Sequence, residues 1–202
     1  MGLYDTYLAV RYRLRDVDGP RHVAVVITER DLLEQGAYET LERFLRWAFR
    51  YDAERVTVLV SVLDEAVVST LERELRELDT PRKMAIRGPT DTERADTPIR
   101  VSIGLGGKRE FAEAVREIAA DVAAGELAPD AIDESTISDR LVFPAEPDLL
   151  IKTGAERLSD FAIWQSVYSE LYFTDVNWRD FREREYLRAL IDFRNRKRRF
   201  GT

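Results

Sequence analysis

The sequence predicts an α/β fold with a mostly parallel central sheet and helices on both of its faces. Three observations lead to this prediction: short apolar runs of strand length, longer segments with apolar residues at helical spacing, and a regular alternation of the two along 202 residues. With 45% hydrophobic residues, the chain can bury one substantial core. We therefore expect a single domain over residues 1–202.

The strand-like runs are rich in Val, Ile and Leu, which is typical of strands buried on both faces. They are HVAVVI at 22–27, RVTVLVSV at 55–62, KMAIR at 83–87, IRVSIGL at 99–105 and PDLLIKT at 147–153. Apolar residues at helical spacing predict helices over 32–50, 64–78, 109–124, 159–171 and 179–194. The expected order is β-α-β-α-β-β-α-β-α-α. In such a sheet, ligands bind outside the carboxyl ends of the strands.

The composition disfavours several classes of function. The absence of Cys removes disulfides, thiolate chemistry and Cys-based metal sites, which suits a cytoplasmic protein. A net charge of −7 disfavours a nucleic-acid partner, and the basic run RNRKRRF is typical of the end of a helix. The charged opening stretch MGLYDTYLAVRYRLRD predicts neither a signal peptide nor a spanning helix. The polar stretch at 87–98 is predicted to be a surface loop.

The strongest candidate site follows the last predicted strand, within the stretch IKTGAERLSDFAIWQSVYSELYFTDVNW. A turn at 152–154 would aim backbone N–H groups and the Lys152 ammonium at an anion. Arg157 adds a second cation, and Ser159 is a natural helix N-cap. Capping explains the hydroxyl but neither cation, so the pattern favours a diphosphate site. Glu170 offers a hard oxygen ligand to Mg²⁺.

Aromatic residues in the same region are spaced like one buried helical face. They are Phe161, Trp164, Tyr168, Tyr172, Phe173 and Trp178. His22 is the only histidine, and we interpret it as structural because no second His or Cys is present to complete a catalytic or zinc arrangement.

The segment PDLLIKTGAERLSDFAIWQSVYSELYFTDVNWRDF closely resembles the C-terminal signature of the cis-prenyltransferases, the undecaprenyl or dehydrodolichyl diphosphate synthases. That signature has an Asp-Leu-Leu-Ile strand followed in order by R-T-G-G-E, R-x-S-N-F, W-Q and Y-x-E-L-Y-F-T-D. GLGGKREFAEAVREIA, DAIDESTISDRLV and ALIDFRNRKRRFG extend the similarity to about residues 99–201. The resemblance implies an undecaprenyl diphosphate synthase-like fold and the prenyltransferase chemistry of isoprenoid biosynthesis, with a polyprenyl diphosphate product.

The resemblance also assigns site residues. Those that hold the diphosphate of isopentenyl diphosphate are Lys152, Arg157, Ser159, Arg199 and Gly201. Glu170 corresponds to a family residue that helps to bind Mg²⁺. The chain departs from the family pattern in three places: Lys152 replaces Arg, Ala155 replaces the second Gly, and one residue is missing before Arg157. The aromatic region and the basic tail correspond to parts of the family that build a dimer contact.

The loop after the first predicted strand departs much further. The family places D-G-N-G-R-W-A there, whereas this chain reads TERDLLEQG. The essential Asp falls on Thr28, the glycines on Glu29 and Asp31, and the phosphate-binding Arg on Leu32. Two acidic side chains thus occupy positions where backbone N–H groups cradle phosphate, and we expect them to repel it. Thr28 with Asp31 three residues later is typical of a helix N-cap, and Asp31 and Glu34 are expected at a solvated helix start.

These observations favour a catalytically incomplete subunit, a pseudoenzyme that keeps the isopentenyl-diphosphate side and the C-terminal Arg-x-Gly. It would pair as a homodimer, or as a heterodimer with a catalytically complete synthase, as some eukaryotic dehydrodolichyl synthases do. Two alternatives stay open: an active cis-prenyl chain-elongating transferase with a remodelled first loop, and a non-enzymatic regulatory binder. Whether the chain is an enzyme alone is left open. Contact with a membrane would be peripheral, through the lipid product.

Overall fold

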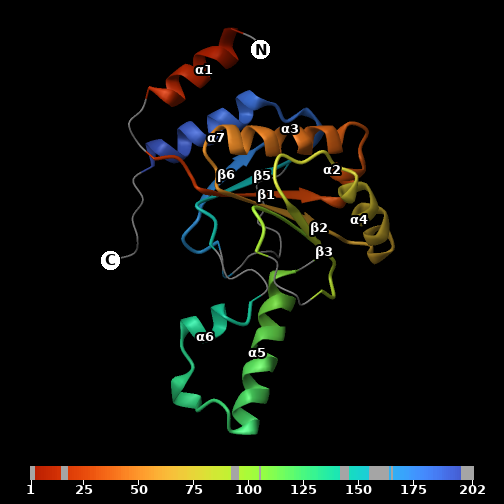
Figure 1. The fold of residues 1–202 in the computed structure, drawn as a ribbon, viewed down its shortest axis with the longest axis vertical. Helices are drawn as coiled ribbons and strands as arrows, with labels where there is room; N and C mark the ends of the chain where they lie inside the picture. Colours follow the sequence, from red (N-terminus) through yellow and green to blue (C-terminus); the bar gives the residue numbers. More distant parts are fainter. Residues whose placement is uncertain are drawn as a thin grey trace.

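The structure is a computed structural model that describes residues 3–14, 18–91, 96–104, 106–141, 146–154, 164 and 166–196. Its centre is a six-stranded sheet in the order β3-β4-β2-β1-β5-β6, in which every neighbouring pair is parallel (Figure 1). The strands are β1 (His22–Thr28), β2 (Arg55–Ser61), β3 (Met84–Arg87), β4 (Ile99–Ile103), β5 (Leu149–Thr153) and β6 (Glu170–Thr174). The predicted α/β class and the five predicted strands are confirmed.

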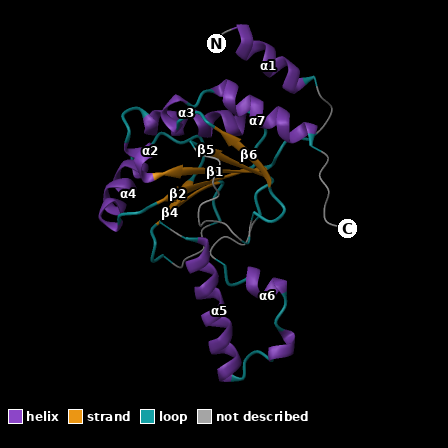
Figure 2. Cartoon of the chain, turned by 180° about the vertical axis from the view of Figure 1, so that it is seen from behind, coloured by secondary structure: helices purple, strands orange, loops and turns teal. Residues whose placement is uncertain are grey.

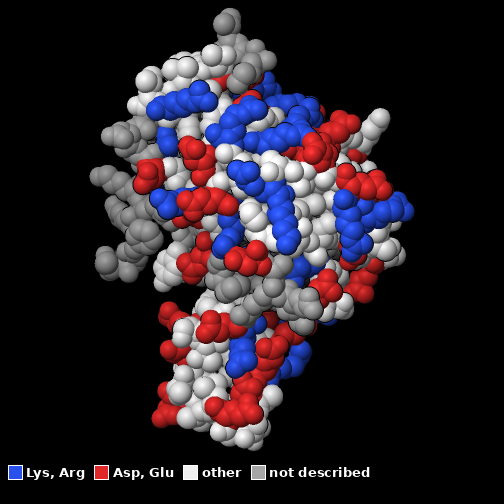
Figure 3. Space-filling model, in the orientation of Figure 1, with Lys and Arg blue, Asp and Glu red and all other residues white. Residues whose placement is uncertain are grey.

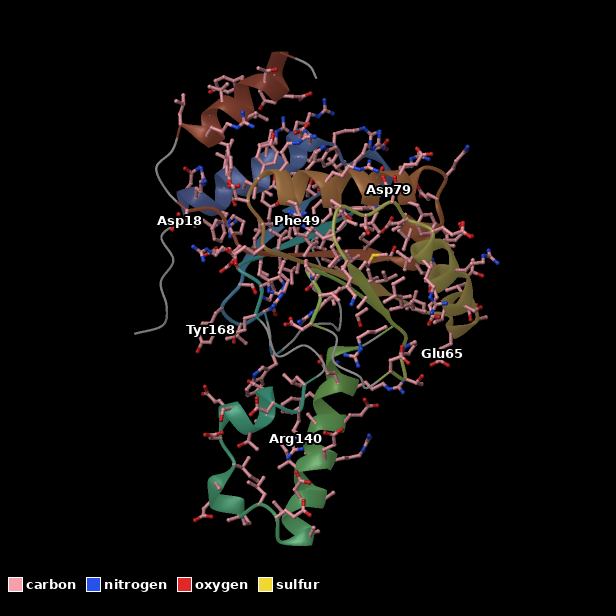
Figure 4. All side chains as sticks on the ribbon, viewed as in Figure 1. Asp18, Phe49, Glu65, Asp79, Arg140 and Tyr168 are labelled. Carbon is pink, nitrogen blue, oxygen red and sulfur yellow. The ribbon has the colours of Figure 1, made fainter. Side chains whose placement is uncertain are left out.

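The helices lie on both sides of this sheet. They are α1 (Leu3–Arg13), α2 (Glu29–Leu33), α3 (Ala37–Arg50), α4 (Val68–Arg76), α5 (Gly107–Ala124), α6 (Glu134–Ser138) and α7 (Glu183–Asn195), with short 3₁₀ turns η1 (Glu65–Val67), η2 (Pro129–Ala131) and η3 (Trp178–Asp180). Helices α3 and α7 cover one face, and α1 lies over α7 (Figures 1 and 2). Helices α5 and α6 project from the other side as an arm, on which Arg140 is labelled in Figure 4. An ion pair between Arg140 and Asp121 of α5 closes the arm.

The main core lies between the sheet and the layer of α3 and α7. Phe44 of α3 is at its centre, and its ring makes edge-to-face contacts with Trp178, Phe181 and Tyr186 at centroid distances of 5.7, 6.1 and 5.4 Å. The indole N–H of Trp178 donates a hydrogen bond to the Ala37 carbonyl at 3.1 Å. A smaller apolar cluster, formed by residues from the strands alone, occupies the opposite face of the sheet. This packing holds the strands in register and so fixes the edge at which they end.

Two helix predictions differ from the structure. The segment predicted as one helix over 32–50 forms α2 and α3, which are separated at Gly36, a residue with a left-handed backbone (φ 82°). Glycine adopts this conformation without steric cost, so it breaks the helix. The helix predicted over 159–171 is wrong at its carboxyl end, where Glu170 and Leu171 lie in β6. Helix α1 was not predicted at all, because its apolar residues do not follow a single helical face.

His22 begins β1 at the amino edge of the sheet, away from the strand ends that matter for ligands. Its Nδ1–H donates to the Glu146 carbonyl at 3.2 Å, and its Nε2 accepts from the Thr57 hydroxyl at 2.8 Å. Burial lowers the pKa of His22 from 6.5 to about 4, so the ring is neutral at pH 7. These contacts agree with the structural interpretation of this residue.

Among the described residues, no helix is long and apolar enough to cross a membrane. The stretch at 87–98 is only partly the surface loop that was predicted. Arg87 is buried at the end of β3, and Thr97 is buried with its hydroxyl donating to the Ile99 carbonyl at 2.7 Å. The expectation of a single domain stays a prediction.

Candidate functional site

The candidate site lies at the edge of the sheet where all the strands end. The chain passes from β1 to β2 on one side and later returns to β5 on the other, so the topological switch point lies between β1 and β5. Ligands of open α/β sheets bind in the crevice at this point. Val26 of β1 is in register with Lys152 of β5, and Thr28 is in register with Ser61. The carboxyl ends of β1 and β5 therefore lie next to each other at this point.

Lys152 is a buried cation at the end of β5. Its residue is only 6% exposed, and it lies on the same face of the strand as Leu150, which belongs to the small apolar cluster. Across the sheet its neighbours in register are Val26 and Phe173, both apolar. In the part of the chain that the structure describes, no hydrogen bond or ion pair involves its ammonium group. A buried charge without a partner is costly, and a bound anion offsets that cost.

The backbone N–H of Gly154, which the sequence predicted to point at an anion, is already used in a hydrogen bond within the chain. Gly154 has a left-handed conformation with φ 85°, but its N–H donates to the Thr174 carbonyl at 3.0 Å. This hydrogen bond extends the pairing of β5 with β6. The expectation of a backbone N–H aimed at an anion is therefore wrong for Gly154. The ammonium of Lys152 and the buried hydroxyl of Thr153 are donors at this turn that have no partner among the described residues.

The end of β1 is a closed structural motif. The hydroxyl of Thr28 donates to Asp31 Oδ2 at 2.6 Å, while the N–H of Asp31 donates to Thr28 Oγ1 at 3.2 Å. This capping box starts α2, and the predicted N-cap is confirmed. Leu32, which stands where the family has its phosphate-binding Arg, is completely buried in the main core.

Glu29 has a role that the sequence did not indicate. It is 7% exposed, and its Oε2 accepts hydrogen bonds from the N–H groups of Leu63 at 2.9 Å and Asp64 at 3.3 Å. The carboxylate thus joins the end of β1 to the end of β2. Two backbone donors thus compensate the charge of this buried carboxylate. No sequence signal links residues that are more than thirty positions apart.

Glu170 does not meet Lys152 within the chain. It starts β6 in register with Leu149, whereas Lys152 is in register with Phe173, roughly 10 Å further along the strands. Its Oε2 accepts from Arg196 at 3.2 Å. Among the described residues, no group of three or more His, Asp or Glu side chains is placed to hold a metal ion. With Thr28 in place of the family's Asp, the described residues of one chain do not form a Mg²⁺ site.

Several predicted residues fall elsewhere. Arg157, Ser159, Phe161, Arg199 and Gly201 lie outside the described residues. The prediction of one aromatic helical face is wrong for the members that the structure describes, because Tyr172 and Phe173 alternate on β6 and Trp178 is buried in η3. Trp164 instead donates from its indole N–H to Ser138 Oγ at 3.1 Å and stacks on Phe111, so it contacts the arm.

Comparison with known proteins identifies the family. Residues 68–201 match the family model described as "Putative undecaprenyl diphosphate synthase". The chain belongs to this family. The match begins at Val68, so the closed motif after β1 and the contact of Glu29 with β2 lie outside it. Family membership therefore rests on the part of the chain that contains Lys152.

Similar proteins span archaea, bacteria and plants. A tritrans,polycis-undecaprenyl-diphosphate synthase (geranylgeranyl-diphosphate specific) of Methanopyrus kandleri is 49% identical over 113 residues, which are 54% of this chain and 41% of that protein. A synthase of the same description from Thermococcus kodakarensis is 29% identical over 245 residues, covering 98% of this chain and 92% of that protein. The matched stretches span between 41% and 51% of the first three relatives.

Solved structures give the same fold. The crystal structure of lavandulyl diphosphate synthase from Lavandula x intermedia, in complex with dimethylallyl diphosphate, has a TM-score of 0.76 and 27% identity, and the match covers 91% of this chain and 98% of that one. A probable undecaprenyl diphosphate synthase from Campylobacter jejuni has a TM-score of 0.64 over 92% of this chain and all of that one, at 20% identity, and supports the fold alone.

Proposed function

We propose that this chain is a cis-prenyltransferase homologue that does not elongate isoprenoid chains alone and instead supplies one half of a site to a second subunit. The observation that carries the proposal is the end of β1. Thr28 and Asp31 are hydrogen-bonded to each other and Leu32 is buried, at the positions where the family has its Asp, its second Gly and its Arg.

Electrostatics oppose an allylic diphosphate at that position. The carboxylates of Glu29 and Asp31 are held there by hydrogen bonds, so a phosphate would meet negative charge in place of N–H and guanidinium donors. The loss of one such donor commonly lowers turnover by about 10²–10³. Because several are replaced together, we expect no measurable elongation by the isolated chain.

The residues at the end of β5 support the proposal that the chain keeps the isopentenyl-diphosphate half of the site. The buried ammonium of Lys152 is suited to the diphosphate of isopentenyl diphosphate, and Arg157 and Ser159 follow it in the family order. Lysine is a point charge and lacks the bidentate grip of the family's arginine. We therefore expect weak binding that falls as salt rises, because charge pairing provides most of it.

The second subunit is either another copy of the chain or a catalytically complete synthase. We propose that this chain lends it Arg199 and Gly201, because arginine binds phosphate in a bidentate way and glycine lets the backbone approach closely. Glu170, far from Lys152 in its own chain, is proposed to serve the partner's site. Mg²⁺ bound there would neutralise charge on the diphosphate.

A turnover assay tests the proposal. The purified chain is incubated with Mg²⁺, labelled isopentenyl diphosphate and an allylic diphosphate, alone and with a complete synthase from the same source. We expect no elongation alone and raised turnover with the partner. Lys152→Met should abolish the rise in turnover that the partner gives. Lys83→Met, at an exposed lysine before β3, should leave that rise unchanged.

Other outcomes select the alternatives. Elongation by the isolated chain that is lost in Lys152→Met contradicts the proposal and identifies an active synthase with a remodelled loop. Calorimetry that detects no isopentenyl diphosphate binding, with or without the partner, contradicts it in favour of a regulatory binder.

A further inference from the structure

Helix α1 packs on the molecule with one face and presents a second apolar face to solvent. Leu8, Ala9 and Tyr12 are buried against the body of the protein, where the guanidinium of Arg194 lies 3.6 Å from the centroid of the Tyr12 ring. These contacts fix α1 on α7, and both ribbon views place α1 at the outside of the molecule (Figures 1 and 2).

The outward face carries an apolar stripe, with the exposed Arg11 on the same side of the helix. Its members, here called the outer stripe, are Tyr4, Tyr7, Val10 and Leu14, with exposed fractions of 49%, 56%, 50% and 80%. Three of them recur every third residue and Leu14 follows four later, so they share one side of the helix. The rings of Tyr4 and Tyr7 stack with centroids 6.3 Å apart.

Positive charge borders the outer stripe. Arg11 and Arg13 are exposed on α1, and Arg188 of α7 lies over the ring of Tyr4 with its guanidinium 5.5 Å from the centroid. Arg184 and Arg188 share one carboxylate, that of Glu185, so two cations stand against one anion at this turn of α7. Figure 3 shows basic side chains gathered over α3 and α7, although the whole chain has a net charge of −7.

We propose that the outer stripe docks on an anionic phospholipid surface. Tyrosine rings sit favourably at the boundary between headgroups and acyl chains, apolar residues such as Val10 and Leu14 enter it, and flanking arginines pair with lipid phosphates. A narrow stripe on an outermost helix fits a flat bilayer better than the groove of a protein partner. The inference goes beyond the proposed function and stands without it, since it needs neither the site nor a partner subunit.

Flotation with vesicles tests the docking surface in the full chain without any substrate. Wild type should bind vesicles of phosphatidylcholine with about one third phosphatidylglycerol and bind neutral vesicles at least about tenfold less. The triple variant Tyr7→Ser, Val10→Ser, Leu14→Ser should lower partitioning about tenfold or more, because the buried face of α1 is unchanged. The control, Leu33→Ser with Val115→Ser, removes exposed apolar residues from α2 and α5 and should bind normally.

A second pair of variants separates charge from folding effects. Arg11→Gln with Arg13→Gln should lower binding to anionic vesicles about tenfold or more and weaken its salt dependence, whereas Arg73→Gln with Arg76→Gln on α4 should not. The proposal is overturned if wild type ignores anionic vesicles, or if the triple variant binds them as wild type does. A triple variant that changes the oligomer in sedimentation and leaves vesicle binding intact likewise overturns it and assigns the stripe to contact between copies.

Discussion

The ends of β1 and β5 lie next to each other at the same edge of the sheet, but their buried charges differ in hydrogen bonding. At the end of β1, the carboxylates of Glu29 and Asp31 are both satisfied by hydrogen bonds within the chain. At the end of β5, Lys152 is as buried as Glu29, but no described residue pairs with its ammonium. The two side chains are about equally buried, but only the carboxylate of Glu29 has hydrogen-bond partners among the described residues.

This difference separates a structural motif from a binding group. A closed set of hydrogen bonds stabilises the fold and leaves nothing for a ligand to do. An uncompensated buried charge lowers stability and is retained where a ligand of opposite charge completes it. The two strand ends therefore predict opposite responses to mutation.

Among these changes, removing residues 199–202 should have the largest effect, which we expect on turnover of the complex with a complete synthase. The truncation deletes Arg199 and Gly201, and we expect turnover of the complex with a complete synthase to fall about 10²-fold or more, the usual cost of one electrostatic stabiliser. Pairing, followed by size-exclusion chromatography, should not change. Removing Thr202 alone is the control. A fully active truncated complex would show that the tail is not lent to the partner.

Glu29→Ala should destabilise the fold. The substitution leaves the N–H groups of Leu63 and Asp64 without their acceptor, and hydrogen bonds to charged groups contribute about 1.5–3 kcal/mol. We expect the free energy of unfolding in urea to fall by about 2–3 kcal/mol. Glu65→Ala, at an exposed residue nearby, is the control and should change little. If Glu29→Ala and Glu65→Ala were equally stable, the hydrogen bonds of Glu29 would not stabilise the fold. The proposed difference between the ends of β1 and β5 would then be wrong.

His22 gives a pH-dependent effect at the opposite edge of the sheet. Its pKa is lowered by burial from 6.5 to about 4, so folding favours the neutral ring. The stabilisation is complete above about pH 6.5 and is lost as the pH falls toward 4, because the unfolded chain takes up the proton first. For a partly exposed ring we expect a loss of about 2 kcal/mol. His22→Gln should flatten this part of the stability profile and leave diphosphate binding unchanged.

Lys152→Met should have the smallest effect on stability, and of the opposite sign to Glu29→Ala. Replacing a buried cation that has no partner among the described residues with an apolar side chain of similar length should raise the free energy of unfolding by about 1 kcal/mol. Binding of isopentenyl diphosphate, measured by calorimetry at low salt, should weaken about tenfold, the loss of one charge-assisted contact. If Lys152→Met were less stable than wild type and bound isopentenyl diphosphate normally, Lys152 would stabilise the fold and would not be a binding group. The ends of β1 and β5 would then have the same role.

Local patterns predicted much of the fold. Apolar runs fix where strands form, and the pairing of Thr28 with Asp31 predicted a helix start that the structure confirms. The family was also readable from the sequence, since its signature is a contiguous stretch that includes Lys152. The segment at 170–174 was misread because a short aromatic and apolar run is compatible with either a helix or a strand. Pairing with β5 decides between them.

The α/β class, the strands and the residues at their ends follow from local sequence patterns, because these depend on neighbours a few positions apart. What the strand ends do follows from tertiary contacts. The bonds of Glu29 to the loop after β2, the burial of Lys152 beside β1 and β6, and the docking of α1 on α7 all join distant segments. Such contacts depend on how the elements pack, and packing determines which buried charges find a partner.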